Sequence, residues 1–202
     1  MSATAPDRRA LLGTVVRLDP LTPDDAPALF AALDDPRVWV SGYAGGPAGR
    51  PTDVAAMQSW VARLLTFTDQ VPYAVRLVDG GTVVGTTSLG EVDVVNESAH
   101  LGWTAYAPAV WGTAVNPECK LLLLGHAFED CGFGRVKIQT DSINERSQAA
   151  IAKLGATREG VLRRHLRRAD GTFRDTVLFS VLREEWPGVR AGLLARVREH
   201  RV

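Results

Sequence analysis

The sequence has little cysteine and no long apolar run. Its two cysteines, Cys119 and Cys131, stand twelve positions apart in an expected helix. That spacing would separate their backbones by roughly 18 Å, which is beyond the reach of a disulfide within the chain. No apolar stretch approaches the roughly 18 residues of a membrane-spanning helix, and the first residues have no signal-peptide pattern. We therefore expect a cytoplasmic chain with reduced thiols and no membrane partner.

An excess of charge of one sign is also missing, since 23 basic residues balance 23 acidic ones. Whole-chain electrostatics therefore give no reason to expect a direct nucleic-acid partner. An arginine cluster at positions 163, 164, 167 and 168 lies in an expected hairpin, where a solvated strand end and a phosphate contact are both open. No cysteines and histidines have the spacing of metal ligands, so no metal site is expected.

The length of 202 residues and the hydrophobic content of 46% are enough for one sizeable domain. We expect this domain over residues 13–202, after a loose N-terminal leader over 1–12. Hydrophobic periodicity and turn residues predict the element order β-α-α-β-β-β-α-β-α-β-β. The expected strands cover 14–18, 73–78, 82–92, 99–106 and 135–141, followed by a hairpin over 157–182, and the expected helices cover about 22–35, 51–67, 117–130 and 144–155. This order predicts a mixed α/β fold, with helices free to cover both faces of one sheet.

The stretch from Val110 to Val115 has almost no side-chain chemistry and leads into an expected helix, with Asn116 as its cap and Pro117 in its first turn. A helix N-terminus offers unpaired amides and about half a positive charge, so it binds anions without lysine or arginine. Two other nucleotide-binding motifs are excluded. The chain has no Gly-Lys-Ser or Gly-Lys-Thr, and its Gly-Phe-Gly at 132–134 follows a helix and lacks a third glycine. The loop therefore predicts a diphosphate site built from backbone amides.

Three longer segments resemble the motifs of the GNAT N-acetyltransferase superfamily, and most of all its RimJ/RimL-like branch. They are HLGWTAYAPAVWGTAVN at 100–116, TDSINERSQAAIAKLGA at 140–156 and EGVLRRHLRRADGTFRDTVLFSVLREEW at 159–186. The resemblance extends from about Val15 to Trp186. It implies the GNAT fold, in which a central mixed, mostly antiparallel sheet of about seven strands is splayed in the middle and flanked by about four helices.

The same resemblance implies acetyl-CoA as the cofactor. It also implies direct acetyl transfer, in a ternary complex, to a primary amine on a protein N-terminus or a small molecule. The alternative is a non-catalytic acyl-CoA-binding or sensing module of the same fold. Asn144 and Ser147 favour the enzyme, whereas His100 in place of the family's glutamate and the lack of an early loop arginine favour the binding module. A homodimer stays open.

For the cofactor, the resemblance implies that the diphosphate lies on the amides of the loop and that the pantetheine arm follows the strand before it. A backbone N–H between Trp103 and Ala105 would polarise the thioester oxygen. That strand is one residue longer than the family's shorter form, which predicts a β-bulge that separates it from the strand over 135–141. Plain packing is the alternative for Trp103. The expected cofactor-binding residues are Trp103, Thr104, Ala105, Val110, Trp111, Gly112, Thr113, Ala114, Val115, Asn116, Asn144 and Ser147.

Three residues are candidates for proton transfer in catalysis. Ser147 matches the family's N-x-x-S motif and could protonate the leaving thiolate, with helix capping as the structural alternative for Asn144 and Ser147. His100 and Glu91 compete as the general base. A reaction with no dedicated base is the third possibility, since an amine with a pKa near 8 is partly neutral already.

The acceptor is expected between the first two helices and the terminal hairpin. The candidate residues there are Trp39, Tyr43, Trp60, Arg163 and His165. Aromatic residues and arginines mix in this region without an acidic cluster. This composition favours a peptide N-terminus, or a small amine that carries its own carboxylate.

Overall fold

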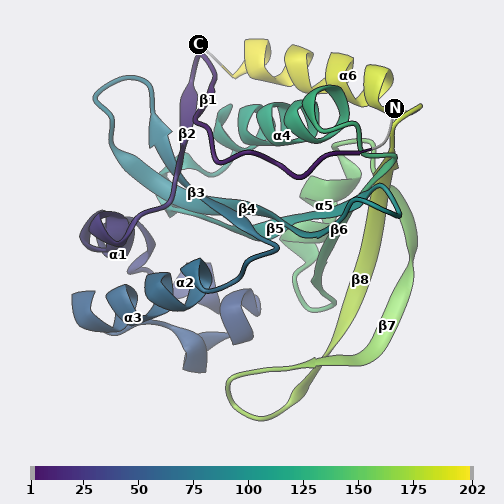
Figure 1. Ribbon diagram of the computed structural model, residues 1–202. Helices are drawn as coiled ribbons and strands as arrows, with labels where there is room; N and C mark the ends of the chain where they lie inside the picture. Colours follow the sequence, from purple (N-terminus) through teal and green to yellow (C-terminus); the bar gives the residue numbers. More distant parts are fainter. Residues whose placement is uncertain (1–2, 201–202) are drawn as a thin grey trace.

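The computed structural model describes residues 3–200, which form one mixed sheet with helices on both of its faces (Figure 1). Within these residues the strands are β1 (Leu11–Leu12), β2 (Val16–Pro20), β3 (Val71–Leu77), β4 (Val83–Asp93), β5 (Ser98–Tyr106), β6 (Arg135–Asp141), β7 (Thr157–Arg167) and β8 (Phe173–Leu182). Their order is β1-β2-β3-β4-β5-β6-β8-β7, and all neighbours are antiparallel except β5 and β6. The expected mixed, mostly antiparallel sheet is confirmed, with eight strands in place of about seven.

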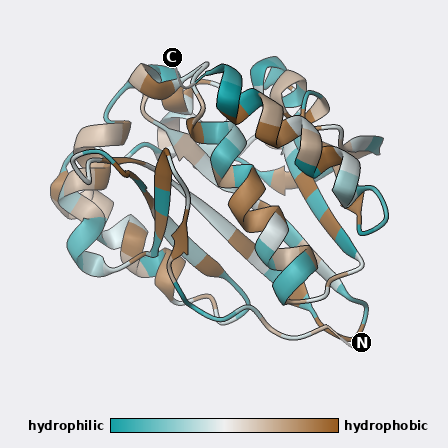
Figure 2. Cartoon of the chain, turned by 90° about the horizontal axis from the view of Figure 1, so that it is seen from above, coloured by the Kyte–Doolittle hydropathy of each residue, from teal (hydrophilic) through white to brown (hydrophobic). Residues whose placement is uncertain are grey.

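The α-helices of the described chain are α1 (Ala26–Leu33), α2 (Pro36–Trp39), α3 (Val54–Leu65), α4 (Val115–Gly125), α5 (Glu145–Ala152) and α6 (Trp186–Glu199). Helices α4 and α6 cover one face of the sheet, and α1, α2 and α3 lie on the other (Figure 1). Figure 2 shows hydrophobic and hydrophilic residues alternating along the strands and around the helices, as elements with one buried face require. None of the helices between residues 3 and 200 is long and apolar enough to cross a membrane.

The segment before residue 13 differs from the expected loose leader. Leu11 and Leu12 pair with β2, Leu11 is buried in the main core, and the backbone N–H of Thr4 donates to the carbonyl oxygen of Cys131 at 2.9 Å. A two-residue strand is too short to show a periodicity, so no sequence pattern indicated it. The described part of this segment is therefore packed against the domain.

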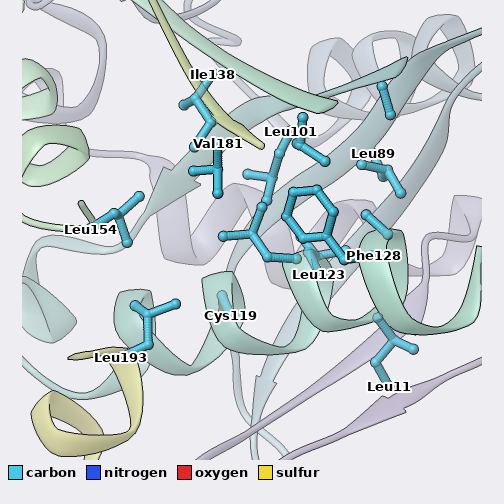
Figure 3. Close-up of a cluster of buried hydrophobic side chains, with 14 of the residues drawn as sticks. Leu11, Leu89, Leu101, Cys119, Leu123, Phe128, Ile138, Leu154, Val181 and Leu193 are labelled. Atoms are coloured by element: carbon cyan, nitrogen blue, oxygen red, sulfur yellow. The ribbon is translucent and has the colours of Figure 1, made fainter. Parts of the chain in front are cut away.

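Two hydrophobic cores lie on the two faces of the sheet. The larger one contains buried side chains of α4 and α6 together with those of the central strands. Figure 3 shows Cys119 and Leu123 of α4, with Leu101, Ile138 and Val181 of the sheet in the same cluster. The smaller core joins α1, α2 and α3 to the opposite face. Both cysteines are free, buried thiols.

Helix α4 is fixed to the sheet edge by a buried carboxylate. Glu118 is 3% exposed and accepts the backbone N–H groups of Thr14, Val15 and Val16 at 3.0, 2.6 and 2.7 Å. The Thr14 hydroxyl adds a fourth hydrogen bond at 2.6 Å. These charge-assisted bonds set the position of the helix whose first turn borders the candidate site.

Three of the four arginines in the hairpin cluster make contacts within the chain, so neither alternative, a solvated strand end or a phosphate contact, describes the whole cluster. Arg168 forms two hydrogen bonds with the carboxylate of Asp141, at 2.9 and 2.8 Å, and this carboxylate is almost fully buried. The guanidinium groups of Arg164 and Arg167 lie over the ring of Phe173. The turn between β7 and β8 is thereby tied to the end of β6.

Candidate active site

The sheet opens between β5 and β6. The two strands pair in parallel only through residues 98–100 and 135–137, where His100 is the last paired residue of β5. Beyond His100, Gly102 and Ala105 of β5 pair with Ser88 and Thr86 of β4, so β5 has one extra residue between these two pairs. Trp103, within this stretch, has a φ of 50°. The predicted β-bulge and the predicted splay are both confirmed. The second half of β5 therefore keeps backbone groups without a strand partner on the β6 side.

The loop over 110–114 enters α4 two residues earlier than expected. Helix α4 begins at Val115 with Ala114 as its N-cap residue, and no side chain caps it. The hydroxyl of Thr113 accepts the Val115 N–H at 3.3 Å, so Asn116 lies inside the first turn and the predicted capping role of Asn116 is wrong. Gly112 has a φ of 77°, and a Cβ atom built on it would meet nothing within 4 Å. The loop thus presents bare backbone toward open space at a helix N-terminus.

Helix α5 lies beside this loop. The side chain of Asn144 accepts the Ser147 N–H at 2.9 Å, so the capping alternative holds for Asn144, and Ser147 is half-buried in the first turn. Between these two residues, Arg146 places its guanidinium 3.5 Å from the ring centroid of Trp111. The Trp111 indole N–H donates to the carbonyl oxygen of Tyr106 at 2.9 Å. Trp111 therefore joins β5, the loop and the N-x-x-S helix.

The two competing base candidates form one pair. His100 is 3% exposed, and its Nδ1 lies 2.9 Å from Glu91 Oε1, while the other oxygen of Glu91 pairs with Lys137. The hydrogen bond from His100, together with Lys137, lowers the pKa of Glu91 to about 2. Burial lowers the pKa of His100 below its ordinary value, against the opposing effect of Glu91. The imidazole is therefore neutral at pH 7, with Nδ1 as donor to the carboxylate.

The other imidazole nitrogen is free to accept a proton. His100 Nε2 is buried and has no hydrogen-bond partner within residues 3–200. A Cβ atom on Gly102 would lie 2.5 Å from it, so only glycine fits at that position. The ring of Trp103 packs against the imidazole in a tilted arrangement, with the ring centroids 4.5 Å apart and the planes at 46°. The unpartnered nitrogen therefore sits at the point where β5 leaves β6.

The acceptor candidates divide into core residues and one site residue. Trp39 and Trp60 are 1% and 6% exposed and belong to the smaller core, so they do not line a pocket as expected. They contact Tyr43 instead, with ring centroids 5.3 and 6.3 Å from it. The Tyr43 hydroxyl donates to the carbonyl oxygen of Trp103 at 3.3 Å, and burial raises its pKa. Tyr43 thus reaches the bulge of β5 as a neutral phenol.

The two acceptor candidates in the hairpin, Arg163 and His165, lie in a bulge of β7 between Leu162 and Leu166. Arg163 is exposed, and His165 Nδ1 lies 3.0 Å from the hydroxyl oxygen of Thr176. Neither lines the cavity of about 560 Å³ between the loop after α2 and the hairpin turn. That cavity is lined by Ala44, Gly45, Ala48, Gly49, Arg63, Arg167, Arg168 and Ala169. The predicted acceptor region is therefore hollowed and basic, although other arginines than Arg163 face it.

Sequence reasoning missed Lys120. This side chain is 5% exposed, and its Nζ donates to the hydroxyl oxygen of Thr104 at 2.9 Å. Burial lowers the pKa of Lys120 to about 8. The available signal was helical spacing, because Leu123 and Leu124, three and four residues later, are fully buried.

These residues fit an acyl-CoA molecule. The open backbone at Gly112 suits a diphosphate, the unpaired half of β5 suits the amides of a pantetheine arm, and the orphaned His100 Nε2 lies where the strands part. No group of three or more histidine, cysteine, aspartate and glutamate side chains in the described chain is placed to hold a metal ion.

Comparison with known proteins agrees with this geometry. Residues 16–157 match the model of the acetyltransferase (GNAT) domain family. YdaF of Bacillus subtilis (strain 168), provisionally named a ribosomal N-acetyltransferase, is 31% identical over 112 residues, which make up 55% of this chain and only 60% of YdaF.

Solved structures are similar over nearly the whole chain. A provisionally named acetyltransferase from T. thermophilus is 40% identical, with a TM-score of 0.84 over 93% of this chain and 96% of that one. RimJ of Mycobacterium smegmatis, solved in complex with CoA-disulfide, is 24% identical, with a TM-score of 0.77 over 96% of this chain and 97% of that one. At that identity, the likeness to RimJ concerns the fold.

Proposed function

Because the chain belongs to the GNAT acetyltransferase family, we propose that it is an N-acetyltransferase that moves an acetyl group from acetyl-CoA to a primary amine by direct attack in a ternary complex. The observation that carries the proposal is the opening of the sheet: β5 leaves β6 after His100, beside the N-terminus of α4. The name of YdaF and the likeness to the RimJ fold favour the RimJ/RimL-like branch.

The chain's part in cofactor binding is mainly backbone. The N–H groups of Val110, Trp111 and Thr113 already donate to carbonyl oxygens of the same loop. The amides of Gly112, Ala114 and Asn116 and the dipole of α4 would therefore hold the diphosphate, without a basic side chain at Ala109 or Val110. The unpaired backbone of β5 from Trp103 to Ala105 would hold the pantetheine arm and donate an N–H to the thioester oxygen. When bound, acetyl-CoA supplies an activated acyl group with a thiolate as leaving group.

For proton transfer we assign His100 as the general base and Glu91 as the residue that orients it. Glu91 holds Nδ1 of His100, which leaves the unprotonated Nε2 to accept the proton that the attacking amine loses. Ser147, at the start of α5, would return a proton to the leaving sulfur. Tyr43 donates to the Trp103 carbonyl and so would fix the bulge that aligns the reacting groups.

The acceptor would enter from the cavity between the loop after α2 and the hairpin. Arg63, Arg167 and Arg168 line it, and no acidic side chain does. Because Arg168 is paired with Asp141, Arg63 and Arg167 supply the positive charge of the cavity. This charge favours an acceptor with a carboxylate near its amine, on a peptide or on a small molecule.

Two measurements test the proposal. Thermal unfolding with and without acetyl-CoA tests binding, because a ligand at about 100 times its Kd stabilises the folded state by about 2.7 kcal/mol. An unchanged unfolding temperature at millimolar acetyl-CoA would contradict the proposal. Thiol release is then followed with a panel of N-terminal peptides and a panel of small amines. Stabilisation without thiol release on either panel would favour the non-catalytic binding module.

A further inference from the structure

Lys120 is a buried cation that the proposed reaction does not use. It lies in the second turn of α4, and its hydroxyl partner Thr104 is itself 2.8 Å from the hydroxyl of Thr87. Lys120 takes part in no ion pair with another residue of the described range 3–200. The nearby carboxylate of Glu118 accepts its hydrogen bonds from the segment Thr14 to Val16 instead. The ammonium therefore has one protein acceptor for its three N–H donors.

A charge in this position costs stability. Burial of an ammonium without a carboxylate is unfavourable, and a Lys among leucines could be replaced by an apolar residue of the same length. Burial indeed lowers the pKa of Lys120 to about 8. The ammonium of Lys120 therefore costs folding free energy and has no carboxylate partner, which points to a hydrogen-bond acceptor on a bound ligand.

The place of Lys120 indicates which partner that is. Thr104 follows the bulge residue Trp103 on the unpaired half of β5, and α4 carries the cofactor loop at its N-terminus. We infer that Lys120 is a cofactor-binding residue, whose ammonium donates a hydrogen bond to a carbonyl oxygen of the pantetheine arm. This inference rests on the proposed function. It would give the site a positive charge that the loop lacks at Ala109 and Val110.

The test compares two probes that differ in the pantetheine arm. Acetyl-CoA carries the arm, and 3′-phospho-ADP carries the same diphosphate without it. Calorimetric titrations are made with the wild type, with Lys120→Met, and with Lys153→Met as an exposed control. We expect Lys120→Met to weaken acetyl-CoA binding about tenfold or more, as the loss of a charged hydrogen bond does, and to change 3′-phospho-ADP binding by less than about twofold.

Each other outcome contradicts the inference. An equal loss for both probes would mean that Lys120 only supports the fold through Thr104, and an unchanged acetyl-CoA affinity would mean no contact. A wild type that binds neither probe would instead overturn the proposed function, on which the inference depends. Lys153→Met should match the wild type with both probes.

The wild type also gives a test that needs no variant to fold. Above pH 8 the phosphates of both probes are essentially fully ionised, including the terminal phosphate of 3′-phospho-ADP, so the ratio of the two affinities between pH 8 and pH 9.5 reports the protein. The other titratable groups around Lys120 are silent in this window: burial raises the pKa of Cys119 to about 12 and that of Tyr106 well above its ordinary value, and His100 is already neutral. We expect acetyl-CoA to lose several-fold in affinity relative to 3′-phospho-ADP across this range. A constant ratio would overturn the inference.

Discussion

Replacing Lys120 with methionine should change how stability depends on pH in the ligand-free protein. The pKa of Lys120 is about 8 in the folded chain, against a reference value of 10.5. Below pH 8 the side chain is charged in both the folded and the unfolded state, so the full cost of burying the ammonium is present. Between pH 8 and pH 10.5 the folded state has released the proton while the unfolded state still holds it, so the wild type becomes more stable as pH rises.

The size of this effect follows from the two pKa values. Integrating the difference in bound protons from pH 7 to pH 9.5 gives a gain of about 2 kcal/mol for the wild type relative to Lys120→Met. Urea unfolding at both pH values measures the difference, and all other titrating groups cancel because both proteins contain them. Lys153→Met, at an exposed position, should track the wild type within about 0.5 kcal/mol. An equal stability gap between wild type and Lys120→Met at pH 7 and pH 9.5 would refute a desolvated ammonium.

The remaining predictions concern catalysis and the position of α4. His100→Gln should lower turnover about 100-fold or more with little change in acetyl-CoA affinity, and wild-type turnover in the variant would exclude His100 as base. Because burial lowers the pKa of His100, protonation of this imidazole should reduce wild-type turnover only at a pH below the ordinary imidazole range. Ser147→Ala should slow thiol release with cofactor affinity nearly unchanged, and full activity would remove Ser147 from the acid role. Glu118→Gln should lower the free energy of unfolding by about 3 kcal/mol in urea titrations, because an amide cannot accept all four donors; a loss below about 1 kcal/mol would contradict this anchor, and Glu145→Gln is the exposed control.

The sequence predicted the elements that repeat a strong pattern. The bulge of β5 followed from one extra residue in a recognisable strand, and it correctly predicted the gap to β6. The mixed sheet followed from the order of strands and helices. The sequence analysis missed β1, α2 and α6; β1 and α6 lie at the two ends of the described chain, and α2 is a single turn. Of these, α6 had a readable signal, since Trp186, Val189, Leu193 and Val197 repeat at helical spacing and are all buried.

The site was harder to predict, because its details depend on burial. Asn116 is a residue type that often caps helices, yet the helix begins at Val115 with Ala114 in the cap position, and Asn116 lies inside the first turn. Trp39 is an aromatic residue of the kind that often lines a pocket, yet its side chain is buried in the smaller core. His100 and Glu91 compete as bases in the sequence, and only strand register shows that they form a hydrogen-bonded pair. Each of these outcomes follows from tertiary packing, which composition and spacing do not encode.

The most direct test of the proposed cofactor site is the affinity for acetyl-CoA of two glycine variants with the same backbone conformation. Gly112 and Gly81 have φ values of 77° and 67°, and a Cβ atom at either would meet nothing within 4 Å, so valine strains both backbones without a clash in the chain. Calorimetric titration of the wild type, Gly112→Val and Gly81→Val should show that the wild type and Gly81→Val bind alike. Gly112→Val should bind about tenfold or more weakly, because its side chain occupies the approach to the loop amides. Equal affinity in all three proteins would contradict a diphosphate site at this loop.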